Sequence, residues 1–319
     1  MAEGPAIPRT LVIALGGNAI LRRGDDGTIE TQFERADASM RHIAVLAGSG
    51  DRIVLTHGNG PVVGNIVLRN EAARDLVPPM PLYIAGADSE GGIGLMLQMS
   101  LHNRLRLAGV DRPVVSVITQ CVVDADDPAF TAPSKPIGPY FDADGAACLT
   151  LEEDWTFAEE GDRGWRRVVA SPRPRRVIEA KTIRRLAEEG DIVIAAGGGG
   201  VPVLEHEDGT LEGVDAVIDK DWASALLACE IDAETLVILM EEARVFTDYG
   251  TPQQRALKRL NVAEVDELLA RGGLAKGSIR PKVEACAYFT RTCGRDAIIC
   301  AVDALEDALA GRAGTRIVP

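Results

Sequence analysis

The stretch "LVIALGGNAI", residues 11–20, joins a run of five apolar residues to the turn Gly16-Gly17-Asn18. A short apolar run that ends in glycines predicts a strand buried on both faces, followed by a tight turn. Glycines in such a turn let backbone N–H groups approach an anion. The stretch contains no lysine or arginine before Arg22, so the charge that would balance an anion comes from elsewhere in the chain.

Further short apolar runs recur along the chain. They lie at residues 52–56, 114–119, 191–196, 235–240 and 297–302. Amphipathic helical stretches separate them. In the first, the apolar residues that share one helical face are Phe33, Ala36, Met40, Ile43 and Ala47. Apolar strands joined by helices predict an α/β fold with a mainly parallel sheet that helices cover on both faces.

Residues 124–175 interrupt this alternation, because they are rich in proline, glycine and charged residues and contain Trp155 and Trp165. The segment is too long for an ordinary loop and too aromatic for a disordered linker. We therefore predict a single domain over residues 1–319 with a small protruding subdomain inserted at 124–175.

Composition excludes several classes of function. The net charge of −14 argues against non-specific binding to nucleic acid, which requires a basic surface. No apolar run approaches the roughly 18 residues of a membrane span, and the N-terminus lacks a signal-peptide pattern. The six cysteines form no CxxC pair, which favours free thiols over a metal site. We expect a cytoplasmic protein with no membrane or nucleic-acid partner.

Three predicted strands end in glycine-rich turns. The turns are Gly16-Gly17-Asn18, Gly58-Asn59-Gly60 and Gly197 to Gly200. Ligands of open parallel sheets bind beyond the carboxyl ends of the strands, so three such turns predict one cleft for an anion. None of them matches a P-loop or a dinucleotide-binding fingerprint. His57 adjoins the second turn, where either contact with substrate or simple packing would explain it.

Three lysines are candidates for the missing charge. Lys220 stands between Asp219 and Asp221, just before an apolar helical run. Either Asp221 caps that helix and Lys220 is solvated, or a carboxylate positions Lys220 toward a phosphoryl group. Lys282 follows Pro281 in a predicted first helical turn, where a cation opposes the helix dipole unless an anion is bound. Lys135 lies between prolines in the inserted segment and is either delivered by a flap or solvated.

Seven motifs resemble, in order, those of carbamate kinases in the amino-acid kinase superfamily. They are "ALGGNAI", "THGNGPVVGN", "KPIGPY", "RGWRRVVASPRP", "AAGGGGVPV", "VDAVIDKDWAS" and "PKVEA". The resemblance runs from about residue 10 to about residue 290. It implies an open αβα sandwich with a protruding subdomain, a homodimer, and a place in arginine metabolism. It also implies Mg²⁺-dependent, reversible phosphoryl transfer between ATP and carbamate, giving ADP and carbamoyl phosphate.

The resemblance also implies roles for individual residues. Phosphates and substrate would be bound by Gly16, Gly17, Asn18, Gly58, Asn59, Gly60, Gly198 and Gly199. Lys220 and Lys282 would neutralise the nucleotide and the transferring group, and Tyr249 would contact the nucleotide. Asp219 would orient lysines, and Lys135 would reach in from the subdomain. No residue of the chain is expected to bind the metal directly.

The chain departs from the family pattern at two places. Ser89-Glu90-Gly91 stands where the family usually has Thr-Gln-Gly, and Met240-Glu241-Glu242 replaces a small hydroxyl residue and a neutral turn. These changes keep two alternatives open. One is a related kinase for another small carboxylate, and the other is a non-catalytic sensor of nucleotide or acyl phosphate. The three lysines favour an enzyme.

Overall fold

The computed structural model describes residues 8–22, 24–153, 155–274 and 279–319. Its centre is an eight-stranded sheet in the order β15-β17-β16-β12-β1-β2-β9-β3. The strands are β1 (Thr10–Leu15), β2 (Arg52–His57), β3 (Val114–Ser116), β9 (Ile192–Ile194), β12 (Thr235–Met240), β15 (Arg259–Asn261), β16 (Ala297–Ala301) and β17 (Thr315–Val318). All neighbouring pairs are parallel except β16 with β17. The predicted mainly parallel α/β sheet is confirmed.

Strand β1 lies in the middle of this sheet and is buried along its whole length. Val12 pairs with Leu236 of β12 on one side and with Val54 of β2 on the other. Because side chains alternate between the faces of a strand, Leu11 and Ile13 pack into one core and Val12 into the other. The apolar run at residues 11–15 therefore supplies both cores.

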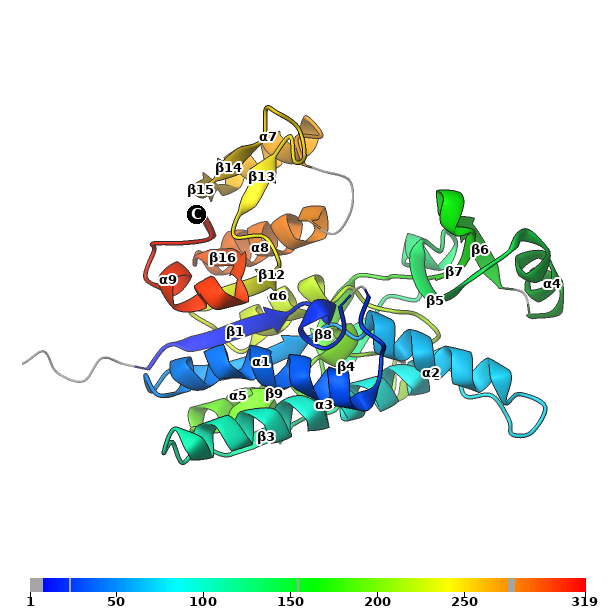
Figure 1. Cartoon of the computed structure of the whole chain (residues 1–319), viewed down its shortest axis with the longest axis horizontal. Coiled ribbons are helices and arrows are strands. Elements are labelled where there is room, and N and C mark those ends of the chain that lie inside the picture. The colour runs from blue at the N-terminus through cyan, green and yellow to red at the C-terminus, as the bar shows by residue number, and fades with distance from the viewer. Residues whose placement is uncertain (1–7, 23, 154, 275–278) are drawn as a thin grey trace, which may run out of the picture.

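Helices cover both faces of the sheet. One face carries α1 (Ile29–Ala47), α3 (Leu82–Leu107) and α9 (Leu305–Leu309). The other carries α5 (Ala180–Glu188), α6 (Lys220–Glu230), α7 (Val262–Ala270) and α8 (Ile279–Cys293). Figure 1 shows α1 and α3 of the first layer lying side by side. This arrangement is the open αβα sandwich that the resemblance implied.

Smaller sheets flank the central one. β4 (Gln120–Val123), β8 (Pro174–Val177), β10 (Val201–Glu205) and β11 (Leu211–Gly213) form a four-stranded sheet, and β13 (Val245–Thr247) pairs with β14 (Arg255–Leu257). Between β4 and β8, the chain forms β5 (Lys135–Phe141), α4 (Ala143–Glu153), β6 (Thr156–Glu159) and β7 (Trp165–Val169). These three strands make their own antiparallel sheet, in a lobe that projects from the body (Figure 1). The boundaries 124–175 for a separate unit stay a prediction.

The carboxyl ends of β1, β2, β9, β12 and β16 meet at one edge of the sheet, because these strands run parallel. At this edge begin α2 (Gly60–Ala72) and three short 3₁₀ helices, η1 (Gly17–Ala19), η4 (Gly197–Gly199) and η5 (Val302–Ala304). Two further 3₁₀ helices are η2 (Pro128–Phe130) and η3 (Gly161–Arg163). Ligand sites of parallel sheets lie at this kind of edge.

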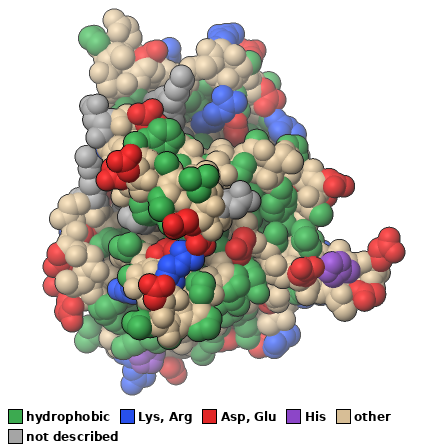
Figure 2. Space-filling view, turned by 90° about the vertical axis from the view of Figure 1, so that its right-hand side faces the viewer, with side chains coloured by type: hydrophobic (Ala, Val, Ile, Leu, Met, Phe, Trp, Pro, Cys, Tyr) green, Lys and Arg blue, Asp and Glu red, His purple; other side chains and the backbone are tan. Residues whose placement is uncertain are grey.

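The surface on the lobe side mixes charges. Figure 2 shows acidic, basic and apolar side chains side by side on this face, without one extended basic area. In the parts of the chain that the structure describes, no helix combines the length and the apolar character that a membrane crossing requires.

Candidate active site

The three glycine turns pack against one another at the carboxyl edge of the sheet. A Cβ atom on Gly58 would lie 3.0 Å from the backbone nitrogen of Gly17 and 3.2 Å from Cδ of Lys220. Gly198 has a positive φ of 65°, and a Cβ on it would lie 2.1 Å from Nδ2 of Asn59. Side chains would therefore block this approach, and the glycines bring the predicted anion-binding turns into one place.

The other residues of the turns are fixed by neighbouring elements. The buried Asn59 donates from Nδ2 to the Ser89 hydroxyl of α3 over 2.8 Å. Gly60 begins α2, and a Cβ on Gly199 would lie 2.4 Å from the Ile218 carbonyl oxygen. Gly16 precedes η1; Asn18 belongs to η1, but its side chain lies outside what the structure describes.

Two lysines share one buried carboxylate beside these turns. Nζ of Lys220 lies 2.5 Å from Oδ1 of Asp221, and Nζ of Lys282 lies 3.0 Å from Oδ2 of the same residue. Asp221 is only 3% exposed. Burial raises the pKa of the Asp221 carboxyl, but the two ammonium groups outweigh it and hold that pKa below its usual value. Burial lowers the pKa of Lys220, and Asp221 opposes this shift.

The contacts of the two aspartates differ from one of the two sequence-based alternatives, in which Asp221 caps α6 and Lys220 is solvated. Asp219, and not Asp221, caps α6, because its Oδ1 accepts from the backbone N–H of Asp221 over 2.9 Å. The other oxygen of Asp219 accepts from Nζ of Lys135 over 2.9 Å. Asp219 thus contacts the lysine of the lobe, while Asp221 holds Lys220 and Lys282. Asp221 is the second residue of α6, and its Oδ2 faces Lys282 of α8.

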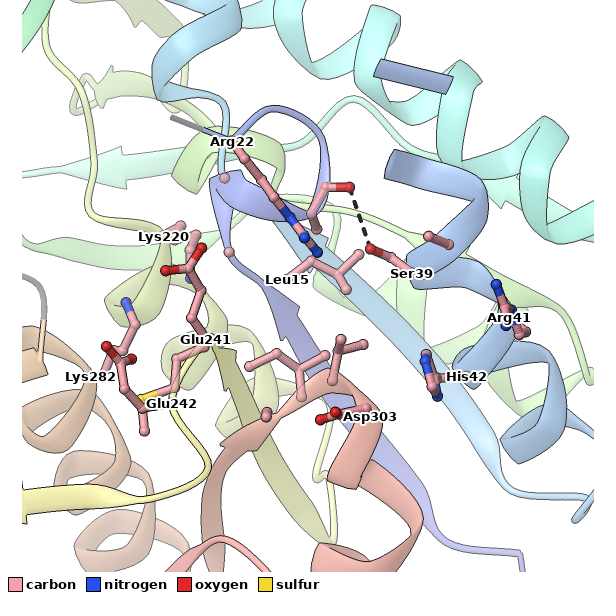
Figure 3. Close-up of a pocket in the computed structure, with 18 residues that line it drawn as sticks. Leu15, Arg22, Ser39, Arg41, His42, Lys220, Glu241, Glu242, Lys282 and Asp303 are labelled. Atoms are coloured by element: carbon pink, nitrogen blue, oxygen red, sulfur yellow. Dashed lines mark hydrogen bonds between the residues drawn. The ribbon is translucent and has the colours of Figure 1, made fainter. Parts of the chain in front are cut away.

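A pocket of about 740 Å³ opens in front of the paired lysines. Its lining residues include Gly16, Gly17, Lys220, Lys282, Glu241, Glu242, Arg22, Ser39, Arg41, His42 and Asp303. Figure 3 places Glu241 and Glu242 on the same side of the pocket as the lysines, and Arg41, His42 and Asp303 on the opposite side. The residues from α1 carried no sequence signal, because only the packing of α1 beside the sheet edge brings them here.

Tyr249 lies in the turn between β13 and β14 and is 50% exposed. Its hydroxyl donates to Oε1 of Glu242 over 3.3 Å, and this contact links it to a pocket-lining residue. Tyr249 itself stands outside the lining described above. Its contact with nucleotide stays a prediction, as do the roles of the glycines and lysines in binding and catalysis.

Two buried titratable side chains support the turn at Gly197. The backbone N–H of Gly197 donates to Oε1 of Glu90 over 2.8 Å, and that of Thr119 donates to Oε2 over 3.2 Å. Burial raises the pKa of Glu90 to about 8, although these hydrogen bonds oppose it. Glu90, which the sequence marked only as a departure from the family, is therefore largely protonated at neutral pH.

His57 is the second buried group, with no exposed surface. Burial lowers the pKa of His57 to about 4, so the imidazole is neutral at neutral pH. Its Nδ1 lies 3.2 Å from the Gly58 carbonyl oxygen, and a Cβ on Gly197 would lie 2.4 Å from Nε2. Of the two explanations that the sequence left open, this burial favours packing beneath the glycine turns.

Comparison with known proteins adds a family to this geometry. Residues 9–301 match the Amino acid kinase family. Carbamate kinase of Pyrococcus horikoshii is 45% identical, over 98% of this chain and 100% of that protein. Carbamate kinase-like protein YahI of Escherichia coli is 42% identical, over 97% of this chain and 98% of that protein.

Solved structures agree with the sequence relatives. Carbamate kinase from Giardia lamblia bound to AMP-PNP has 38% sequence identity and a TM-score of 0.92, with 98% of each chain covered. The resemblance to carbamate kinases is therefore confirmed over nearly the whole length of the chain. The chain belongs to the amino acid kinase family and, within it, to the carbamate kinases.

Proposed function

We propose that this chain catalyses reversible phosphoryl transfer between ATP and carbamate, with ADP and carbamoyl phosphate as the other pair of reactants. The observation that carries the proposal is the Asp221 carboxylate, which holds the ammonium groups of Lys220 and Lys282 beside three converging glycine turns. Family membership at 45% identity to a carbamate kinase supports the choice of substrate.

The paired lysines act by electrostatic stabilisation. Phosphoryl transfer spreads negative charge over the equatorial oxygens and over the attacking and leaving oxygens, so catalysis depends on positioning and on charge neutralisation. Two ammonium groups around one carboxylate leave one positive charge in excess within this cluster of three side chains. Because Asp221 fixes both groups before substrate binds, little reorganisation is needed in the transition state. The backbone N–H groups of the glycine turns would bind the phosphate oxygens.

Lys135 would add a third cation from the lobe. Its ion pair with Asp219 connects β5 of the lobe to the residue before α6, which is next in sequence to the pocket-lining Lys220. We propose that residues 124–175 act as one subdomain that delivers Lys135 to the transferring group, with Asp219 as its positioning partner.

The nucleotide would enter as a magnesium complex. Among the described residues, no group of three or more histidine, cysteine, aspartate or glutamate side chains is placed to hold a metal ion. Mg²⁺ is commonly held by substrate phosphates, with water and one or two carboxylates. A pocket that presents ammonium groups fits phosphates that carry their own metal. Bound in this way, Mg²⁺ would neutralise charge between neighbouring phosphates.

We further propose a homodimer, which rests on exposed apolar side chains along α3. Ile84, Leu95 and Met99 are spaced so that they share one face of this helix, and Ile118 lies beside them at Gly91. An exposed apolar strip of this kind is typical of a protein interface. Sedimentation velocity of the wild type and of Leu95→Lys would test the dimer. The cytoplasmic location and the place in arginine metabolism stay predictions.

A second candidate function is phosphoryl transfer to another small carboxylate. Glu241 and Glu242 line the pocket on the lysine side, and a relative at 42% identity bears the name carbamate kinase-like protein. The test is a coupled assay for ATP formation from ADP and Mg²⁺, with carbamoyl phosphate in one arm and acetyl phosphate in the other. Faster ATP formation with carbamoyl phosphate supports the first proposal, and faster formation with acetyl phosphate supports the second. ADP binding without ATP formation in either arm would indicate the remaining alternative, a non-catalytic sensor of nucleotide or acyl phosphate.

A further inference from the structure

Cys229 and Cys293 approach each other at the far ends of the two helices that carry the paired lysines. Cys229 is the penultimate residue of α6, and Cys293 is the last residue of α8. Their sulfur atoms lie 2.7 Å apart, which is closer than ordinary van der Waals contact. A disulfide bond is about 2.05 Å long, so the sulfurs need to move only about 0.7 Å to form one.

The approach does not depend on the thiols themselves. Nη1 of Arg295 donates to the carbonyl oxygens of Asp232 and Ala233 over 2.7 Å and 2.8 Å. The same guanidinium lies 2.9 Å from a carboxylate oxygen of Asp232. These bonds fasten the chain just after α8 to the chain just after α6. The packing of the helices therefore holds the two thiols close together.

The other four cysteines lack this combination of access and a partner. Cys121, Cys286 and Cys300 are buried, whereas Cys229 and Cys293 are partly exposed. Cys148 is exposed in α4, but no contact between it and a second sulfur is found among the described residues. Cys229 and Cys293 therefore combine partial exposure with a second thiol in contact.

We propose that Cys229 and Cys293 form an oxidisable pair, which small-molecule disulfides of the glutathione class convert to an intramolecular disulfide that joins α6 to α8. In the first step one cysteine loses its proton, and its sulfur displaces a small thiolate from the oxidant to form a mixed disulfide. The second cysteine loses its proton and attacks that bond, which releases the second small thiolate. The two protons pass to the departing thiolates. The protein loses two electrons, and the oxidant gains them.

The local environment makes this oxidation slow near neutral pH. Burial and the neighbouring Cys293 raise the pKa of the Cys229 thiol, while Arg295 opposes the shift. Because the thiolate is the attacking species, the cross-link should form faster as pH rises from 7 to 9. This pair is thus suited to a stabilising cross-link rather than to rapid sensing.

The cross-link should stabilise the chain and leave catalysis intact. Cys229 is nine positions after Lys220, which is about 14 Å along a helix, so the bond forms far from the ammonium groups. The sequence separation of 64 between the cysteines makes a long closed loop, and such loops lose much entropy in the unfolded state. For a chain of this length the effect corresponds to a rise in Tm of about 3–6 °C.

The test treats the full-length protein with oxidised glutathione at pH 8.5, followed by alkylation under denaturing conditions and peptide mass spectrometry. The expected result is a peptide pair linked through Cys229 and Cys293, two fewer alkylated cysteines, and the higher Tm. Cys293→Ser should abolish the linked pair, and Cys148→Ser should leave it unchanged. Circular dichroism checks that both variants fold.

Three outcomes would overturn the proposal. One is full alkylation of all six cysteines after oxidation, and another is a persistent mixed disulfide on Cys229 without a cross-link. The third is a disulfide in the oxidised wild type that joins other cysteines and leaves Cys229 and Cys293 alkylated.

Discussion

Replacing Glu90 by glutamine separates the charge of this buried side chain from its shape. Burial raises the pKa of Glu90 from 4.5 to about 8. When the pKa of a group is higher in the folded chain than in the unfolded chain, the group contributes stability. That stability is present in full when the pH is below the pKa of the unfolded chain. This stability is lost as pH rises through the folded value, because the native chain keeps a proton that the unfolded chain releases. Between these two pKa values, each rise of one pH unit lowers the free energy of unfolding by about 1.4 kcal/mol.

Between pH 5.5 and pH 7.5 the wild type should therefore lose about 2–3 kcal/mol through this one side chain. With an unfolding entropy of about 2.1 cal/mol/K per residue, the loss corresponds to a fall in Tm of about 4 °C. Glutamine does not ionise, so this component should be missing from Glu90→Gln. Its amide nitrogen cannot accept from Gly197 or Thr119, which costs about 1–3 kcal/mol at every pH.

The assay is thermal unfolding by circular dichroism at pH 5.5, 6.5 and 7.5. Glu90→Gln should be less stable than the wild type at pH 5.5, and the difference should shrink as pH rises. Ser89→Ala is the matched control, because it removes a buried hydrogen bond to Asn59 without removing a charge. The Tm of Ser89→Ala should lie below that of the wild type by the same amount at each pH. Parallel curves for the wild type and Glu90→Gln would show that protonation of Glu90 does not contribute to the pH dependence of stability.

Three further predictions concern other residues of the site. Lys135→Ala should lower kcat of ATP formation about tenfold or more and leave Tm nearly unchanged, since its ion pair is partly exposed. The double variant Glu241→Gly/Glu242→Val should bind ADP–Mg²⁺ about two- to fivefold more tightly in calorimetric titration, because two carboxylates leave the lysine side of the pocket; equal affinities would contradict this. Burial lowers the pKa of His57 to about 4, so the neutral ring contributes stability that is present above pH 6.5 and lost as pH falls through 4. His57→Gln should therefore show a weaker fall in Tm between pH 6.5 and pH 4, and an unchanged acid transition would speak against it.

The parts of the fold that follow from local sequence were predictable. The run at residues 11–15 is apolar at every position and lies in the centre of the sheet, buried on both faces. The glycine turns were also recognisable, because a turn after a strand needs residues that leave the backbone accessible. The short strands β15 and β17 were not predicted. They have little periodicity of their own and depend on pairing with each other and with β16.

The candidate site was predictable in its residue types but not in its contacts. The sequence singled out Lys220 and Lys282, yet Asp221 looked like a helix cap. Only the packing of α6 against α8 brings Lys282, 61 residues away, onto its second oxygen. Glu90 was visible as an unusual residue, but its burial depends on how α3 packs against η4 and on Thr119. Long-range packing of this kind leaves no pattern in a single sequence.

We propose that the lysines held by Asp221 carry the phosphoryl transfer. The most direct measurement is kcat for ATP formation from carbamoyl phosphate and ADP with Mg²⁺ in Lys220→Ala and Lys282→Ala. Lys181→Ala, which removes an exposed lysine of α5, serves as the matched control. Each site variant should lose about 100-fold or more in kcat while it retains its fold by circular dichroism, and the control should stay within about twofold. Activity within about twofold of the wild type in both site variants would show that these lysines do not carry the reaction.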